Sequence, residues 1–280
     1  MEPLQTDKEP LKLDNTLVEK VLVKFIKEEI ASAGISKAVV GLSGGVDSAV
    51  SCALAARALG PEHVLAVMIP YKSSSPDSLT DAKKVVELTG VRSEIADITT
   101  MAEPYFRDND EIGKLRIGNV LARLRMIVLY DRSAREKALV VGASNKSEIL
   151  LGYGTLFGDL ASAINPIGDL YKTQVWDLAK FLGLPESVIE KKPTADLWEG
   201  QTDEDELGFT YKEVDKLLYS MIDERRNDEE LMAMNFTKRF INEVRELVRK
   251  NQFKRRMPII AKISHRTVNV DFRYIRDWGA

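Results

Sequence analysis

Thiols and imidazoles are scarce in this 280-residue sequence, which contains one cysteine, Cys52, and two histidines, His63 and His265. A single cysteine excludes an internal disulfide, a paired-thiol redox motif and a zinc site built on several thiolates. The histidines lie too far apart in the chain to form the local pair typical of a His-based zinc enzyme. Cys52 itself lies in an Ala/Leu-rich segment, where a packed core thiol is expected. This cysteine usage favours a reducing cytoplasm.

Long apolar runs and a charge excess of one sign are also missing. The longest apolar runs, such as residues 64–70, fall far short of the roughly 20 residues that cross a bilayer, so no membrane span is expected. The 40 basic and 43 acidic side chains give a net charge of −3, which argues against an electrostatically driven nucleic-acid binder. Residues 1–7 have neither a basic nor an apolar signal region, so secretion is not expected and residues 1–14 are predicted to be a flexible lead-in.

Short apolar runs alternate with helical periods along the first half of the chain. Strands are predicted at residues 37–42, 63–70, 92–98 and 138–142, and helices at residues 15–34, 49–60, 77–89 and 114–137. Such alternation predicts βαβ crossovers and therefore a doubly wound α/β fold with a parallel sheet and flanking helices.

The second half of the chain has helical periods and almost no strand pattern. Helices are predicted at residues 173–182, 211–222 and 237–251, so this part is expected to form a helical C-terminal layer of a single domain spanning residues 1–280. A polar, acidic stretch at residues 192–210 is longer than ordinary connections and is predicted to be a mobile lid loop.

A glycine turn, Ser43-Gly44-Gly45-Val46-Asp47-Ser48, lies between the first strand and the following helix. Its backbone amides and the helix N-terminus form a nest for phosphate oxygens, and the two glycines allow close approach. A carboxylate among these donors would repel phosphate unless a divalent cation lay between them, so Asp47 indicates magnesium. The turn lacks both the Walker lysine and the GxGxxG spacing. The alternative is a tight βα turn with a helix cap.

This turn resembles the pyrophosphatase loop of the N-type ATP pyrophosphatases, which cleave ATP between its α- and β-phosphates. An ordered series of further motifs narrows the resemblance to the NAD synthetases. These motifs occupy residues 142–148, 152–159, 165–173, 192–198, 200–204 and 253–256.

The resemblance implies an activity and its partners. NAD synthetases convert deamido-NAD to NAD with ATP and ammonia through an adenylated carboxylate, releasing AMP and pyrophosphate, and they are homodimers with the dinucleotide at the subunit interface. No protein nucleophile is needed, in agreement with the lack of a Ser-His-Asp or Cys-His arrangement. Because Cys52 is expected to be buried and the first 42 residues are too short for a glutaminase, we expect free ammonia as the donor, and a separate glutaminase subunit remains the alternative.

The resemblance also assigns residues to the ATP site. Asp47 and Glu148 match the family's magnesium-binding carboxylates, and Lys172 matches a lysine that contacts ATP phosphates; these three are the predicted catalytic residues. The predicted ATP-binding residues are Gly41, Leu42, Ser43, Gly44, Gly45, Val46, Asp47, Ser48, Ala143, Lys172 and Thr194. Each of these residues also has an alternative role that does not depend on the resemblance. Glu148 could complement a helix dipole, Lys172 could be a solvated lysine at a helix start, and Thr194 could be a hydroxyl in a turn.

A second set is assigned to deamido-NAD. Its members are Arg123, Leu156, Asp159, Ala163, Phe253 and Lys254. The alternatives are an exposed helical arginine for Arg123, a structural carboxylate for Asp159 and a charged tail or RNA-binding patch around Lys254. Many members of the family carry threonine, lysine and aspartate at the positions of Ala143, Leu156 and Ala163, respectively. In this region the chain resembles another branch of the family, which includes glutamine-dependent members.

Two other classes of function compete with this interpretation. One is a different enzyme of the same superfamily, either a GMP-forming amidotransferase subunit or a tRNA-modifying adenylating enzyme, although the single cysteine disfavours thiolating members. The other is an ATP-binding regulatory module without turnover. Glu148, Lys172 and Thr194 argue against such a module, because a turn or cap does not need them.

Overall fold

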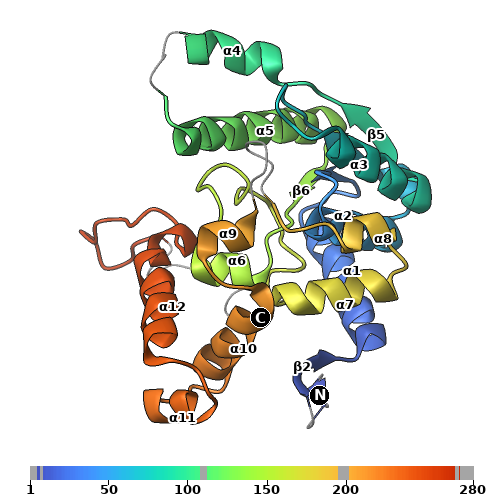
Figure 1. Ribbon diagram of the computed structural model, residues 1–280. Coiled ribbons are helices and arrows are strands. Elements are labelled where there is room, and N and C mark those ends of the chain that lie inside the picture. The colour runs from blue at the N-terminus through green and yellow to red at the C-terminus, as the bar shows by residue number, and fades with distance from the viewer. Residues whose placement is uncertain (1–4, 7–8, 108–111, 195–201, 269–270, 272–280) are drawn as a thin grey trace.

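A parallel sheet lies at the centre of the computed structural model, which describes residues 5–6, 9–107, 112–194, 202–268 and 271 (Figure 1). Its strands are β3 (Ala38–Gly41), β4 (Val64–Met68), β5 (Arg92–Ile95) and β6 (Leu139–Val141), in the order β5-β4-β3-β6 with every neighbouring pair parallel. β4 is buried along its whole length, as expected of a strand covered on both faces. The prediction of a doubly wound α/β fold is confirmed.

The strand order reverses next to β3. β4 and β5 extend the sheet on one side of β3, whereas β6 pairs on the other side, with Val40 opposite Val141. In open α/β sheets, ligands bind at the carboxyl ends of the strands at such a reversal, because the connections diverge there to opposite faces. A ligand site is therefore expected at the turns that follow β3 and β6.

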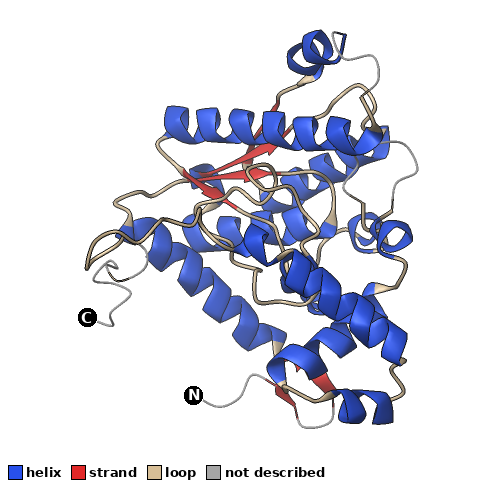
Figure 2. Cartoon of the chain, turned by 90° about the vertical axis from the view of Figure 1, so that its left-hand side faces the viewer, coloured by secondary structure: helices blue, strands red, loops and turns tan. Residues whose placement is uncertain are grey.

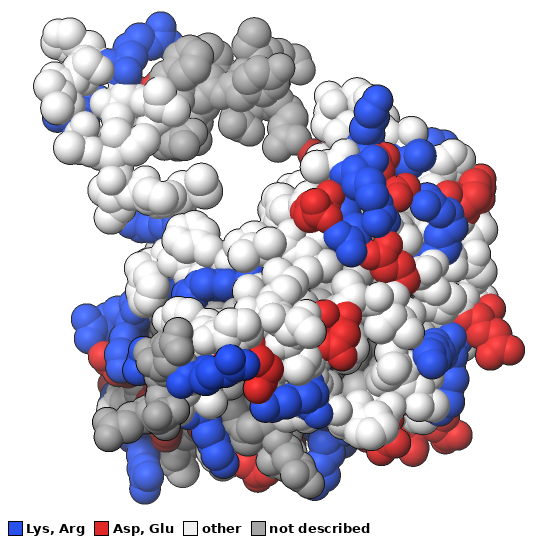
Figure 3. Space-filling model, turned by 90° about the horizontal axis from the view of Figure 1, so that it is seen from above, with Lys and Arg blue, Asp and Glu red and all other residues white. Residues whose placement is uncertain are grey.

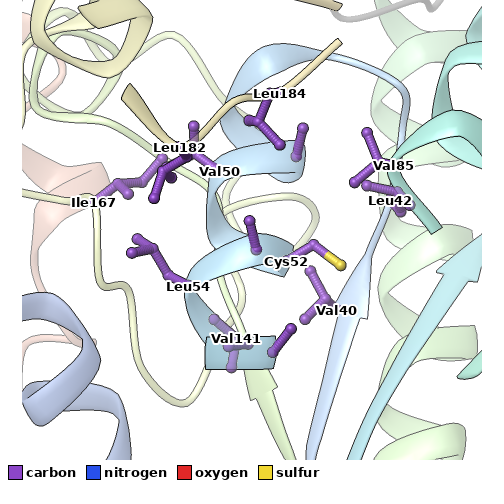
Figure 4. Packing of buried hydrophobic residues seen from close by; sticks show 14 of the residues in the cluster. Val40, Leu42, Val50, Cys52, Leu54, Val85, Val141, Ile167, Leu182 and Leu184 are labelled. Atoms are coloured by element: carbon purple, nitrogen blue, oxygen red, sulfur yellow. The ribbon is translucent and has the colours of Figure 1, made fainter. Parts of the chain in front are cut away.

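Helices cover both faces of the sheet (Figure 2). One face packs against α1 (Asn15–Ser32), α2 (Val46–Leu59), α3 (Pro76–Thr89), α7 (Lys172–Phe181) and α8 (Glu186–Ile189), and the other against α4 (Thr99–Arg107) and α5 (Lys114–Glu136). Cys52 lies on α2 inside the first of these cores, beside Val40, and Leu54 of the same helix points to the opposite side (Figure 4). Burial raises the pKa of the Cys52 thiol to about 12, which confirms the packed-core interpretation.

A helical layer follows the sheet domain, as predicted. It consists of α6 (Lys146–Leu151), α9 (Asp203–Leu207), α10 (Tyr211–Leu218), a π-helical turn η2 (Tyr219–Asp223), α11 (Asp228–Ala233), α12 (Lys238–Lys250) and the 3₁₀ turn η3 (Gln252–Arg255). α10 and α12 contact α6, and α10 also contacts α7, so this layer borders the end of the sheet where β6 terminates. Within the described ranges, no helix is both long and apolar enough to cross a membrane.

Three predicted segments differ in detail. β5 ends at Ile95 instead of residue 98, because it is an edge strand with mostly exposed side chains, and Ile98 instead turns into the core below α4 and α5. The expected flexible lead-in contains β1 (Gln5–Thr6) and β2 (Glu9–Leu13), which pair antiparallel, and the Gln174 amide of α7 donates a 2.9 Å hydrogen bond to the Leu11 carbonyl. Residues 195–201 of the predicted lid loop lie outside the described part of the chain.

Charged side chains of both signs are interspersed on the face that carries α5 (Figure 3). Arg132 and Arg135 of α5 pair with Glu94 of the edge strand, and Arg92 pairs with Glu136 at 2.9 Å. Exposed pairs of this kind contribute roughly 0–1 kcal/mol each. They join α5 to the sheet edge without forming a field of one sign.

Candidate active site

The glycine turn occupies the loop between β3 and α2, where Gly44 has a left-handed φ of +80°. A Cβ on Gly44 would lie 2.1 Å from the Ser78 carbonyl oxygen of α3, so a side chain has no room there. Gly45 has an ordinary φ of −90° and is the N-cap of α2, to which it contributes no side-chain cap. The positive end of the 14-residue helix α2 is therefore directed at the turn, as an anion site requires.

Two hydroxyls hold the turn in this shape. The Ser48 hydroxyl donates to the Gly45 carbonyl at 3.0 Å and accepts from the Ser43 amide at 3.2 Å, while the Ser43 hydroxyl accepts from the Gly45 amide at 3.3 Å. The hydroxyls of Ser43 and Ser48, two predicted ATP-binding residues, thus bind the turn itself. They fix the backbone that would surround a phosphate.

We expect Gly44→Ala to lower the free energy of unfolding by at least about 1–3 kcal/mol, because alanine is strained at a positive φ and its Cβ would meet α3. Gly45→Ala is the matched control: its nearest atom, the Ser43 hydroxyl oxygen, is 3.4 Å away, and the expected cost is about 1 kcal/mol or less. Urea denaturation of both variants measures the difference. Equal stabilities would contradict this conformational requirement at Gly44.

A buried ion cluster lies beside the turn. Lys172, the first residue of α7, places its Nζ 2.5 Å from Asp47 Oδ2 and 3.2 Å from Glu148 Oε1. Asp47 comes from the second position of α2 and Glu148 from the third position of α6, and Lys172 is only 2% exposed. The structure therefore brings the three predicted catalytic residues together at the carboxyl ends of β3 and β6.

Asn145 belongs to this cluster and was given no role from sequence. It is fully buried, its amide Nδ2 donates to Asp47 Oδ1 at 2.9 Å, and its Oδ1 accepts from the Glu148 backbone amide at 3.0 Å. The Glu148 carboxylate accepts from the Asn145 backbone amide at 3.3 Å, which completes a capping box. The Asn-x-x-Glu pattern after a strand is the sequence signal that would have indicated this local arrangement.

Asp203 is a second residue that sequence reasoning missed. It is 3% exposed, its backbone amide donates to the Pro193 carbonyl at 2.9 Å, and the Tyr211 hydroxyl donates to its Oδ2 at 3.3 Å. Its Oδ1 has no hydrogen-bond partner among the described residues. The Lys172 ammonium lies over the ring of the same Tyr211, 5.2 Å from its centroid. Asp203, which is bound to this tyrosine, is therefore a third carboxyl group that acts on Lys172.

The charges of this cluster perturb one another. Burial by itself disfavours the Lys172 ammonium, but Asp47, Glu148 and Asp203 outweigh it and raise the pKa of Lys172 above its ordinary value. Burial raises the pKa of Glu148; Lys172 opposes this rise, and Asp47 and Asp203 reinforce it. Burial likewise raises the pKa of Asp203, against the effect of Lys172. Three carboxyl groups thus share one ammonium, and the raised pKa values of Glu148 and Asp203 reflect too little positive charge around them, a condition that favours an additional cation.

The donor set fits magnesium. Mg²⁺ prefers oxygen ligands and is usually held by one or two carboxylates, with substrate phosphates and water completing its coordination. Asp47 and Glu148 both contact the Lys172 ammonium, so their carboxylates lie close to each other. Within the described ranges, no group of three or more His, Cys, Asp or Glu residues could hold a metal ion by itself.

The remaining predicted ATP residues border the same edge. Ala143 is the second residue after β6. Lys191 donates from its Nζ to the Ser78 hydroxyl at 2.9 Å, which places Lys191 beside the helix that Gly44 contacts. Thr194 comes next after Pro193, whose carbonyl accepts from the amide of the buried Asp203. The segment that leads to Thr194 thus runs from the neighbourhood of the glycine turn to Asp203.

The predicted deamido-NAD residues surround the loop that follows α6. Arg123 of α5 donates from Nη2 to the Leu156 carbonyl at 3.1 Å, and Asp159 Oδ1 accepts from the Thr155 amide at 2.8 Å. Burial raises the pKa of Asp159, and Lys254 opposes this rise. Phe253 is 58% exposed.

Two further members of this set also make backbone contacts. Lys254 Nζ donates to the carbonyls of Gly152 at 2.6 Å and Gly154 at 2.8 Å, so it holds this loop. Ala163 lies beside β6, where its amide donates to the Val140 carbonyl at 2.9 Å.

The fold and the site together define a class: an α/β nucleotide-binding protein with a pyrophosphatase-type turn and two carboxylates suited to a metal–phosphate complex. A family model described as NAD synthase matches residues 18–258. An NH3-dependent NAD(+) synthetase of Chlorobium phaeobacteroides (strain BS1) is 57% identical over 268 residues, which cover 96% of this chain and 97% of the relative. The chain therefore belongs to the NAD synthase family.

Solved structures agree with this assignment. The NH3-dependent NAD synthetase from Campylobacter jejuni superposes with a TM-score of 0.76 at 34% identity, over 89% of this chain and all of the other. An NMN synthetase from Francisella tularensis gives a TM-score of 0.80 at 29% identity, over 90% of this chain and all of the other.

Proposed function

We propose that this chain catalyses the ATP-dependent amidation of deamido-NAD to NAD with ammonia, through an adenylated carboxylate, with release of AMP and pyrophosphate. The proposal is based on the Asp47–Lys172–Glu148 cluster at the N-terminus of α2, beside the glycine turn. The similarity to NH3-dependent NAD(+) synthetases over 96% of the chain supports the choice of substrate and of nitrogen donor.

The phosphate end of ATP would lie against the turn and the N-terminus of α2, whose amides favour negative charge. Asp47 and Glu148 would hold Mg²⁺, which neutralises phosphate charge when bound. Lys172 keeps a positive charge in a buried position, so it would stabilise the negative charge that develops on the departing pyrophosphate. Asn145 would keep the two carboxylates in register.

Activation is required because a carboxylate is a poor electrophile. A nicotinate carboxylate oxygen attacks the α-phosphorus, the bond to the bridging oxygen of pyrophosphate breaks, and a mixed anhydride with AMP forms. Ammonia then attacks the anhydride carbonyl, loses a proton and expels AMP, which leaves the amide of NAD. Each step needs positioning and neutralisation of charge and needs no covalent protein nucleophile.

The deamido-NAD site would lie around residues 152–159. Arg123 and Lys254 would act there by shaping the loop and by presenting positive charge to the dinucleotide phosphates. Asp159, Leu156, Ala163 and Phe253 complete the proposed site. Because Leu156 and Ala163 are apolar, the nicotinate would be recognised without charged contacts at these two positions.

The same proposal includes a homodimer in the cytoplasm. Ile127 and Tyr130 lie three residues apart on one face of α5 and are 50% and 41% exposed. Exposed apolar side chains on the helix that also carries Arg123 are consistent with an interface next to the dinucleotide.

The test is an assay of the purified chain with ATP and deamido-NAD, with and without ammonium. We expect AMP and NAD to form in equal amounts only when both deamido-NAD and ammonium are present, with ammonium at least as effective as glutamine. Nicotinic acid mononucleotide should be tested in parallel, because one structural neighbour is an NMN synthetase. AMP formation that is indifferent to deamido-NAD would refute the proposal, and preferential amidation of the mononucleotide would change its substrate.

A further inference from the structure

At the start of α7, which carries Lys172, the helix's own side chains satisfy only the amide of the N-cap residue, since Gln174 Oε1 accepts from the Tyr171 amide at 2.8 Å. Its N-cap residue is Tyr171, which contributes no side-chain cap and whose hydroxyl is bound to Asp223. The first amides of a helix have no partner within the helix and need acceptors from elsewhere. Lys172 and Thr173, the first two residues of α7, therefore depend on other elements for their backbone hydrogen bonds.

A carboxylate from another helix supplies these acceptors. Asp215 of α10 is fully buried, and its Oδ2 accepts from the Thr173 amide at 2.8 Å and from the Thr173 hydroxyl at 2.8 Å. Its Oδ1 accepts from the Ser147 hydroxyl at 2.5 Å. A negative charge at this place also complements the positive end of α7.

Ser147 connects this carboxylate to both catalytic helices. Its hydroxyl donates to Asp215 and accepts from the Lys172 backbone amide at 2.9 Å. Ser147 is fully buried and immediately precedes Glu148 on α6. One carboxylate thus fixes the start of α7, where Lys172 originates, and the first turn of α6, where Glu148 originates.

We propose that Asp215 is a positioning residue for the adenylation reaction, which sets the relative placement of Lys172 and Glu148 through Ser147 and the first turn of α7. The proposal rests on the roles proposed above for Lys172 and Glu148. Through Asp215, helix α10 of the helical layer would contribute directly to the geometry of the phosphate site.

Asp215 can hold both helices because its carboxylate accepts hydrogen bonds from several donors at once. The Ser147 hydroxyl and the Thr173 amide and hydroxyl all donate to Asp215, and an ionised carboxylate is an acceptor only. In Asp215→Asn one oxygen becomes an amide group that faces these donors, so at least one bond is lost and the two helices shift. Loss of a supporting partner of this kind typically lowers activity about 10- to 100-fold.

The test compares Asp215→Asn with Leu217→Val, a control that removes one methylene from the buried apolar face of the same helix. We expect kcat of the folded Asp215→Asn protein to fall about 10- to 100-fold. The control should lose stability and keep its kcat within about twofold. Thermal unfolding and circular dichroism verify the folded fraction. Unchanged kcat in folded Asp215→Asn, or an equal loss of kcat in the control, would overturn the proposal.

A double-mutant cycle supplies a second measurement. If Asp215 acts through Ser147, then Ser147→Ala should lower kcat in the wild-type background but have less than about a threefold effect once Asp215→Asn is present. Independent, multiplicative effects would contradict the relay. Lys172→Met distinguishes a failure of the proposed catalytic roles from a failure of the role proposed for Asp215. A fully active Lys172→Met protein would refute the roles of the cluster. An inactive Lys172→Met protein together with a normal Asp215→Asn protein would refute only the positioning role of Asp215.

Discussion

Lys172→Met is expected to lower kcat by about 10²- to 10³-fold or more, because it removes a preorganised positive charge from the place where pyrophosphate departs. Methionine keeps the length and apolar stem of the side chain, so the loss measures the charge. Steady-state formation of AMP from ATP and deamido-NAD is the measurement. Lys180→Met is the matched control, since Lys180 lies exposed in the last turn of the same helix. Its activity should stay within about twofold of the wild type.

The same substitution should also change stability. Lys172 is the cation between two partly buried carboxylates, and removal of one partner from a buried ion pair costs about 3–5 kcal/mol. Urea denaturation of the ligand-free variant measures this loss, and Mg²⁺ should recover part of it by binding the carboxylates that remain. A variant with wild-type turnover and wild-type stability would show that Lys172 is an ordinary helix-start lysine.

Asp47→Asn is expected to abolish Mg²⁺-dependent turnover, with a loss of about 10²-fold or more, while the fold stays intact. Asparagine keeps an oxygen that can accept the bond from Asn145, but it lacks the charge that faces Lys172 and that would hold the metal. Activity measured across a range of Mg²⁺ concentrations, together with the melting temperature, tests this expectation.

Asp177→Asn serves as the control for this substitution, because Asp177 is an exposed aspartate on α7. It should retain both turnover and the dependence on Mg²⁺. If Asp47→Asn kept the Mg²⁺ response of the wild type, the metal role of Asp47 would have to be abandoned.

The sheet and most helices follow from local patterns. Short apolar runs located β3, β4 and β6, because strands buried on both faces must be apolar throughout. β5 was predicted too long, since an edge strand with exposed side chains lacks a clear apolar boundary. The order of the strands depends on crossovers that no local pattern records, although the handedness of such crossovers limits the choices.

The site was only partly predictable. The glycine turn showed its chemistry locally, and the motifs around Glu148 and Lys172 carried a resemblance. Asp203 lies in one of the motifs that carried the resemblance, but neither Asp203 nor Asp215 was given a role from sequence. Their burial arises only when α9 packs against α10 and α10 packs against α6 and α7. A charged residue on a short helix is usually solvated, so only the tertiary structure distinguishes these two aspartates from surface carboxylates.

The second substrate site shows a similar limit. The resemblance implied that Arg123 and Lys254 bind deamido-NAD, and the structure shows that both also donate to backbone carbonyls of the loop after α6. Long cationic side chains have several partners within reach, and the sequence does not choose among them.

In the proposed reaction, a carboxylate oxygen of deamido-NAD attacks the α-phosphorus of ATP. Deamido-NAD that carries oxygen-18 in its nicotinate carboxylate tests this step, with mass spectrometry of the phosphorus products. We expect one labelled oxygen in AMP and none in the pyrophosphate. Release of orthophosphate, or AMP without label, would contradict it.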